Sequence, residues 1–341
     1  MAKYVKTEQG YIDIPNFALA PFKSECEPYL TFASLNDFTL SVDDRTKHWN
    51  GTLEYFTSDK TWTTWDGTTT LSAVSDYGGY VLYLRGIRNT VITGGSDKYK
   101  WILNGNDIAC LGNIENLLDY TIVESGDHPT LANGCYAYMF QGCTALTQAP
   151  SLPATTLTGS CYSSMFQGCT ALTQAPSLPA TTLAPGCYEN MFMYCSRLTQ
   201  APALPATTLA NACYNSMFQD CTSLKLSSTK TDEYIQEYRV PSSGNGTSAM
   251  SALIDMFTST GGTFAGTPSI NTTYYLSSNN MVVRGTEIAT LNGYVDSMID
   301  AAISEYADTA EYIIPSSTEG STKKFKITVD DTGTISATEV T

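Results

Sequence analysis

The residues of this chain with the greatest capacity for chemistry are its ten cysteines, eight of which form two regular series. Successive members of each series are 26 residues apart. The first series is Cys135, Cys161, Cys187 and Cys213, and the second is Cys143, Cys169, Cys195 and Cys221. No C-x-x-C pair occurs and only two histidines exist, so the spacing does not predict a zinc site. We therefore expect no metal and no cofactor.

Two interpretations of these cysteines remain open. Cys161 and Cys169 are eight positions apart, which is about 12 Å along a helix and too far for a disulfide. Equivalent cysteines in stacked copies would lie about 5 Å apart, which a disulfide can span. The alternative treats them as small buried hydrophobic residues, and synthesis in a reducing cytoplasm favours free thiols.

No recognisable catalytic motif accompanies the cysteines. The glycine-rich stretch GGSDKYK lacks P-loop spacing, and neither G-x-S-x-G nor H-E-x-x-H occurs. Asp43–Asp44 and Asp330–Asp331 are adjacent carboxylates, and adjacent residues of a strand point to opposite faces. These observations predict a protein that is not an enzyme. A glycan-degrading enzyme remains an alternative, because such enzymes take paired carboxylates from distant positions.

The cysteines belong to a motif that is written four times over residues 131–226. The copies at residues 139–157 and 165–183 are identical in sequence. A fixed period of this length is the signature of a solenoid, in which neighbouring copies stack to bury a shared core. The four phenylalanines Phe140, Phe166, Phe192 and Phe218 are expected to form one buried column.

Within each copy, the apolar spacing predicts a short helix. Tyr162, Met165, Phe166 and Cys169 follow the i, i+3, i+4, i+7 pattern of one helical face. The prolines that follow cannot continue a helix, so the chain must turn and return to the next copy.

The phrase C-Y-x-x-M-F-x-x-C-T-x-L-T-x-A-P resembles the BspA-like leucine-rich repeats. Such repeats occur in surface proteins of gut and oral bacteria and in bacteriophage structural proteins. The resemblance covers about a third of the chain, and it implies a right-handed leucine-rich solenoid used for adhesion.

The repeated surface offers candidate binding residues. Hydroxyl and amide groups suit saccharide hydroxyls because both donate and accept hydrogen bonds. An exposed ladder is expected from Thr147, Gln148, Thr173, Gln174, Thr199 and Gln200. Positions that vary between copies add Tyr138, Glu189, Asn190 and Tyr194. The alternative is that the side chains of the ladder form hydrogen bonds only with one another and with solvent.

Charge and hydropathy narrow the classes of partner. The chain has 18 basic and 33 acidic residues, a net charge of −15, so binding to nucleic acid is not expected. No apolar stretch is long enough to span a bilayer, and membrane insertion is not expected. The first residues, MAKYVKTEQGYIDIPNF, lack the apolar region of a secretory signal. This favours a virion protein made in a host cytoplasm over an exported one, with the bacterial cell surface as the alternative location.

The pattern changes along the chain predict an α+β multidomain protein. Phe38, Leu40 and Val42 alternate as in a strand, and turn signals follow at close spacing. A helix is expected over residues 248–260, before Gly261 and Gly262. In order, we expect an N-terminal arm (1–28), an antiparallel β-sandwich-like domain (29–105), the leucine-rich-repeat solenoid with its N-terminal cap (106–226), a solenoid C-terminal cap (227–285), and an oligomerisation helix with a β-hairpin (286–341).

The last segment predicts self-association. A heptad seam of two repeats is formed by Ile288, Leu291, Val295, Met298 and Ala302. Two strand-like runs flank the turn signal Asp330–Gly333. This segment resembles the C-terminal regions of phage head-fibre and tail-fibre proteins, which implies a homotrimer. Packing of the helix on the solenoid cap is the alternative.

Together these features predict a structural and adhesive fibre of a phage virion, on its head or tail. The expected partners are capsid or tail proteins and a glycan or protein of the bacterial surface. A bacterial BspA-like surface adhesin and a glycan-degrading tailspike are the two alternatives.

Overall fold

The computed structural model describes residues 4–7, 10–13, 29–56, 61–76, 79–277, 312–315, 324–329 and 335–340. The chain divides into two compact units, one formed by Ser24–Glu287 and the other by Met1–Lys23 with Ile288–Thr341. The two units are taken in turn below.

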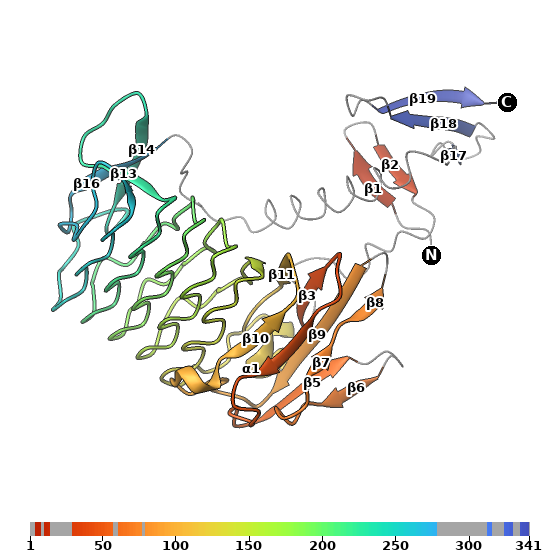
Figure 1. Ribbon diagram of the computed structural model, residues 1–341, viewed down its shortest axis with the longest axis horizontal. Coiled ribbons are helices and arrows are strands. Elements are labelled where there is room, and N and C mark those ends of the chain that lie inside the picture. The colour runs from red at the N-terminus through yellow and green to blue at the C-terminus, as the bar shows by residue number, and fades with distance from the viewer. Residues whose placement is uncertain are drawn as a thin grey trace. The chain divides into compact units, whose positions relative to one another are not determined.

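The larger unit begins with two β-sheets. Their strands are β3 (Leu30–Ser34), β4 (Thr39–Val42), β5 (Thr52–Phe56), β6 (Trp62–Thr64), β7 (Leu71–Ser72), β8 (Val74–Asp76), β9 (Gly79–Ile87), β10 (Trp101–Asn104), β11 (Ile108–Leu111) and β12 (Leu146–Gln148). One sheet has the order β10-β4-β7, and the other has the order β12-β11-β3-β9-β5-β6 with β8 also paired to β9. All pairs are antiparallel except β11 with β12 (Figure 1).

Aromatic side chains fill the space between these sheets. Trp101 of β10 lies 6.4 Å from Phe32 of β3, measured between ring centroids, and 5.5 Å from Trp65. Trp65 and Trp101 are each 1% exposed. The alternation of large apolar residues along β3, β4 and β10 therefore faces a common core, as expected for paired pleated sheets.

One α-helix and one short 3-10 helix occur among the described residues, α1 (Asn116–Glu124) and η1 (Asp97–Tyr99). Asp119 interrupts α1 because its φ and ψ of −154° and 100° are extended. Its carboxylate accepts hydrogen bonds from the backbone N–H of Arg88 and from the N–H and hydroxyl of Thr121. The interruption thus leaves a capped second turn that lies against β9.

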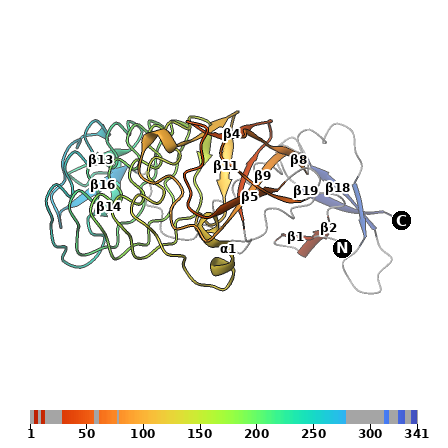
Figure 2. The ribbon, with the colours of Figure 1, turned by 90° about the horizontal axis from the view of Figure 1, so that it is seen from below.

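Beyond the sheets, the chain forms a row of stacked coils, here called the coil stack (residues 131–260; Figures 1 and 2). Each coil contains one turn segment, defined as residues 134–143, 160–169, 186–195, 212–221 and 251–260. Alternate N–H groups of a turn segment donate to the next coil at 2.8–3.0 Å: Ser160, Tyr162, Ser164, Phe166 and Gly168 donate to Pro185, Cys187, Glu189, Met191 and Met193. The N–H groups between them donate to the carbonyl three residues earlier in the same coil.

This hydrogen-bond pattern explains why the turn segments are not helices. An α-helix directs every N–H to the carbonyl four residues earlier, whereas half of these donors serve the neighbouring coil. Every fourth residue also adopts a positive φ, for example 53° at Ser160, 54° at Ser164 and 74° at Gly168. The left-handed conformation ends a helix wherever it occurs. The segments therefore advance as successive tight turns.

The expected fold class is consequently wrong. The described residues are mostly β-sheet and turns with a single α-helix, rather than an α+β arrangement with a helix in every repeat of a leucine-rich solenoid. The helix expected over residues 248–260 is also a turn segment. The sequence did not reveal that this segment is equivalent to the other turn segments, because Phe257 follows Phe218 by 39 residues rather than 26.

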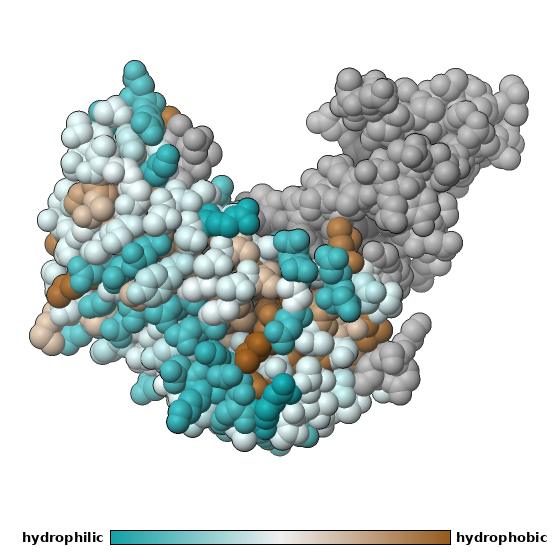
Figure 3. All heavy atoms as spheres, in the orientation of Figure 1, coloured by the Kyte–Doolittle hydropathy of each residue, from teal (hydrophilic) through white to brown (hydrophobic). Residues whose placement is uncertain are grey.

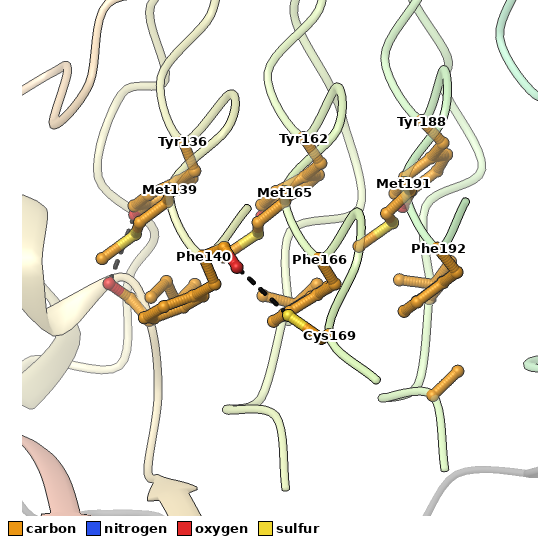
Figure 4. Close-up of a cluster of buried hydrophobic side chains, with 14 of the residues drawn as sticks. Tyr136, Met139, Phe140, Tyr162, Met165, Phe166, Cys169, Tyr188, Met191 and Phe192 are labelled. Carbon is orange, nitrogen blue, oxygen red and sulfur yellow. Dashed lines mark hydrogen bonds between the residues drawn. The ribbon is translucent and has the colours of Figure 1, made fainter. Parts of the chain in front are cut away.

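Aromatic side chains stack along the core of the coils. Neighbouring phenylalanine rings from Phe140 to Phe257 lie 5.6–5.7 Å apart with interplanar angles of 4–13°. Tyrosine rings from Tyr136 to Tyr214 lie 5.6–5.9 Å apart in a second column. Figure 4 shows the two columns with a methionine of each coil between them. All these side chains are buried.

The cysteines belong to the same core. The nine described cysteines are buried and free. Three thiols donate to the carbonyl oxygen of the preceding coil: Cys169 to Phe140 at 3.1 Å, Cys195 to Phe166 at 3.0 Å and Cys221 to Phe192 at 3.0 Å. Their regular spacing therefore reflects a repeated structural position.

The β-sheets and the coil stack share one hydrophobic core that runs from Leu30 to Leu276. The first coil finds hydrogen-bond donors in the sheet region, where the N–H groups of Ile92, Trp101 and Ile108 donate to the carbonyls of Cys135, Met139 and Ala145. The sheet region therefore occupies the place that a preceding coil takes elsewhere in the stack.

A four-stranded sheet follows the fourth turn segment. Its strands are β13 (Lys225–Ser227), β14 (Tyr234–Arg239), β15 (Gly261–Gly262) and β16 (Thr273–Ser277), in the order β14-β16-β13-β15. Between β14 and β15 the chain returns to the stack as the fifth turn segment, and Phe257 extends the phenylalanine column.

The second unit contains two small sheets. Strands β1 (Tyr4–Thr7) and β2 (Gly10–Asp13) pair antiparallel, and so do β17 (Tyr312–Pro315), β18 (Lys324–Val329) and β19 (Ile335–Val340) in that order. The expected oligomerisation residues Ile288, Leu291, Val295, Met298 and Ala302 lie outside the described residues.

Candidate functional site

One surface cluster contains the residue types of a catalytic triad but not its geometry. His48 Nε2 lies 2.8 Å from Asp44 Oδ1 and 2.6 Å from Thr46 Oγ1. A triad needs the acid on one ring nitrogen and the nucleophile on the other, whereas here both contacts fall on Nε2. The His48 ring also stacks on Tyr99 at 3.5 Å. The arrangement organises a loop and does not activate Thr46.

Two further classes of site were sought in the described part of the chain. It contains no group of three or more His, Cys, Asp or Glu side chains placed to hold a metal ion. No helix within it has the length and apolar character needed to cross a membrane.

The expected Thr/Gln ladder lies just after the turn segments. Thr147 and Thr199 are half-buried, and their hydroxyls donate to the backbone carbonyls of Ile108 and Thr173 at 3.1 Å. Thr173 is exposed, and Gln148, Gln174 and Gln200 are half-buried. Gln174 and Gln200 also form a parallel backbone bridge. The ladder therefore uses one hydroxyl to join the first coil to the sheet region and another to join two coils.

The other expected residues lie on the turn segments themselves. Tyr138 and Asn190 occupy equivalent left-handed positions with φ of 63° and 55° and are half-buried. Burial raises the pKa of the half-buried Glu189 carboxyl. Tyr194 is 49% exposed and has a φ of 64°. The predicted binding residues thus fall into two sets on different parts of each coil.

A more accessible polar feature is formed by the A-T-T-L phrase of the first three repeats. Its threonines are all exposed and form no side-chain hydrogen bond within the described part of the chain: Thr155, Thr156, Thr181, Thr182, Thr207 and Thr208. Thr156 pairs with Thr182 and Thr208 pairs with Thr247 through parallel backbone bridges, which hold them in register. We call these six residues, together with the exposed Thr247, the threonine rows.

The threonine rows lie in an uncharged part of an acidic protein. Residues 149–160, 175–185 and 201–212 contain no charged residue, although the chain carries a net charge of −15. On the face seen in Figure 3, hydrophilic and neutral residues cover most of the coil stack, and hydrophobic ones are scattered. The rows therefore present hydroxyl and methyl groups at the regular spacing of the coils.

Sequence reasoning gave the threonines of A-T-T-L no binding role. The available signal was the pair of polar residues set between apolar Ala154 and Leu157 and repeated at 26-residue intervals. Ala154 and Leu157 are buried, and this fixes the two threonines between them at the surface.

Comparisons of this chain with protein-family models, with curated proteins and with solved structures gave no match.

Proposed function

We propose that this protein is a non-enzymatic binding protein whose coil stack holds the threonine rows against a neutral, hydroxyl-rich glycan of a bacterial surface. The observation that carries this proposal is the regular array of exposed hydroxyls within uncharged stretches of the sequence. Each threonine hydroxyl both donates and accepts a hydrogen bond, as saccharide hydroxyls do.

The regular spacing supports a periodic ligand. Neighbouring coils carry the same groups at a separation fixed by the stacked rings, 5.6–5.7 Å between phenylalanine centroids. A polymer of similar repeat can engage several coils at once, and linked weak contacts add to a useful affinity. The shared core keeps the array rigid, so little conformational freedom is lost on binding.

The setting proposed for this activity is a fibre of a phage virion, in keeping with the resemblance of the repeats. A bacterial surface adhesin would use the same face. In both settings the protein attaches to a cell and leaves its glycan intact.

Binding to intact bacterial cells and to their isolated neutral and acidic polysaccharides tests the proposal. We expect saturable binding to a neutral polysaccharide and no release of sugar. The informative variant replaces Thr155, Thr181 and Thr207 with valine, which keeps shape and removes three hydroxyls. Three lost hydrogen bonds should weaken binding roughly tenfold or more.

The matched control is Thr173→Val, which removes an exposed hydroxyl of the Thr/Gln ladder. Unchanged affinity in the triple variant, with loss in Thr173→Val, would move the binding face to the ladder. Release of oligosaccharide by the purified protein would instead place it among the glycan-degrading enzymes.

A further inference from the structure

A buried carboxylate lies beside the first coils, and the binding face does not use it. Glu115 precedes α1 and is 1% exposed. Its Oε2 lies 2.7 Å from His128 Nδ1, whereas its Oε1 has no hydrogen-bond partner among the described residues. A buried carboxylate with an unsatisfied oxygen is costly when charged.

The neighbouring titratable groups give Glu115 no second cation. Tyr136 donates its hydroxyl to the carbonyl of Ile114 at 3.3 Å, and the buried Tyr162 hydroxyl has no partner among the described residues. Burial raises the pKa of both tyrosines well above their usual range, and the nearby cysteines and Glu115 add to this effect. Within the described part of the chain, His128 is the only basic side chain paired with Glu115.

His128 belongs to the segment that connects α1 to the first turn segment, here called the strap (residues 125–133). The N–H groups of Ser125, Gly126 and Asp127 bond back to α1, and the N–H of Ala132 donates to the carbonyl of Thr90. The His128 side chain is 56% exposed while the Glu115 side chain is 1% exposed. The imidazole therefore covers the carboxylate from the solvent side.

We propose that Glu115 and His128 form a pH-dependent latch that holds the strap closed in acid and releases it as the pH rises. A protonated Glu115 avoids the buried charge and can donate its proton to His128 Nδ1, which lies 2.7 Å from Oε2. Protonation of Glu115 therefore stabilises the closed strap.

The direction of this pH dependence follows from the pKa of the Glu115 carboxyl. Burial raises the pKa of Glu115 above its usual 4.5, and the hydrogen bond from His128 only partly opposes this. A raised folded-state pKa means that the contribution to stability is complete below about 4.5 and is lost as the pH rises through the raised value. The carboxyls of Asp44, Asp66 and Asp119 have lowered pKa values and act in the opposite direction.

Hydrogen exchange from pH 4.5 to 8.5, corrected for intrinsic rates, tests the latch in the full chain. In the parent protein, opening of the strap amides at Ser125, Gly126, Asp127 and Ala132 should increase by up to roughly tenfold per pH unit while Glu115 ionises. Glu115→Gln, which keeps the shape and cannot ionise, should show no such increase. Asp66→Asn, which removes an exposed carboxylate, should behave as the parent does.

Equal strap opening in the parent and Glu115→Gln across this range would overturn the latch, and so would an increase shared by all amides of the coil stack. Should Glu115→Gln fail to fold, His128→Ala decides the question. Removal of the imidazole should make strap opening begin at lower pH, and a response identical to that of the parent would reject the proposal.

Discussion

At the scale of single residues, equal positions in the repeat are not chemically equal. The tyrosine column contains rings with nearly the same geometry, yet Tyr136 donates to the carbonyl of Ile114 while Tyr162 has no hydroxyl partner among the described residues. The difference arises because only the first coil has the sheet region beside it. The repeat fixes the ring, and the surroundings of each copy decide its hydrogen bond.

This difference predicts opposite effects for two matched substitutions. Tyr136→Phe removes a satisfied hydroxyl and should lower the free energy of unfolding by about 1 kcal/mol. Tyr162→Phe removes an unsatisfied buried hydroxyl and should leave stability unchanged or raise it by about 1 kcal/mol. Denaturant unfolding of both variants measures the two values, and equal losses would contradict the assignment.

The phenylalanine column should be the most sensitive part of the coil stack. Phe166 is fully buried between Phe140 and Phe192. Phe166→Ala should lower the free energy of unfolding by about 3–5 kcal/mol because it leaves a cavity that stacked neighbours cannot close. Phe166→Leu should cost clearly less. An alanine variant with the parent's unfolding midpoint would show that the column carries little stability.

The thiols should be inert in the folded protein. Burial raises the pKa of Cys143 and Cys195 to about 12, and that of Cys161 and Cys213 to about 11. A Cys26→Ser variant leaves the nine described cysteines, and iodoacetamide at pH 8 should modify them only after denaturant is added. Mass analysis counts the adducts. Rapid modification of the folded protein, or four or more cysteines in disulfides, would contradict this prediction.

At the scale of elements, the apolar spacing identified the buried face but not the backbone. Tyr162, Met165, Phe166 and Cys169 are all buried, as the spacing requires. The same spacing suits successive turns of four residues, so it cannot distinguish them from a helix. Glycines such as Gly142 and Gly168 indicate left-handed positions that a helix would not contain. The pattern is hard to recognise in the sequence because Ser164 and Tyr194 also adopt the left-handed conformation. The strand at β4 was easier to predict, because Phe38, Leu40 and Val42 alternate in sequence.

The left-handed positions give a test of the turn segments. A Cβ on Gly142 would meet nothing within 4 Å, yet Gly142 has a left-handed φ of 75°. Gly142→Ala should therefore cost about 1–2 kcal/mol through backbone strain alone, whereas Gly142→Asn should cost less because asparagine tolerates this conformation. Thermal unfolding compares the two variants, and no loss with alanine would exclude a left-handed Gly142.

At the scale of the whole molecule, distances along the sequence limited what could be predicted. The fifth turn segment was missed because an insertion that includes β14 separates it from the fourth. The contribution of Trp101 to the first coil involves a partner 38 residues away, Met139. The threonine rows become one feature only when the coils stack. The Thr/Gln ladder was expected to be exposed, and the sequence did not reveal that Thr147 and Thr199 bond to backbone carbonyls.

Self-association remains a prediction at this scale. We expect light scattering to give a trimer for the full chain and a monomer for a chain that ends at Gly285. The seam residues Ile288 and Val295 are β-branched and Leu291 lies between them, a pattern that favours dimers in parallel coiled coils. The strands after Pro315 are expected to override that preference. A monomeric full-length chain would contradict the fibre proposal.

The alternating hydrogen bonds between coils also make the protein's length adjustable. Removal of residues 158–183 would join Leu157 to Ala184, and each donor of the first turn segment would then meet an equivalent carbonyl of the third. The copies at residues 139–157 and 165–183 have identical amino-acid sequences, so the two coding stretches are candidates for unequal recombination. Such exchange adds or deletes a whole coil and leaves both ends of the stack intact. A lineage carrying this gene can therefore lengthen or shorten its threonine rows in one genetic step.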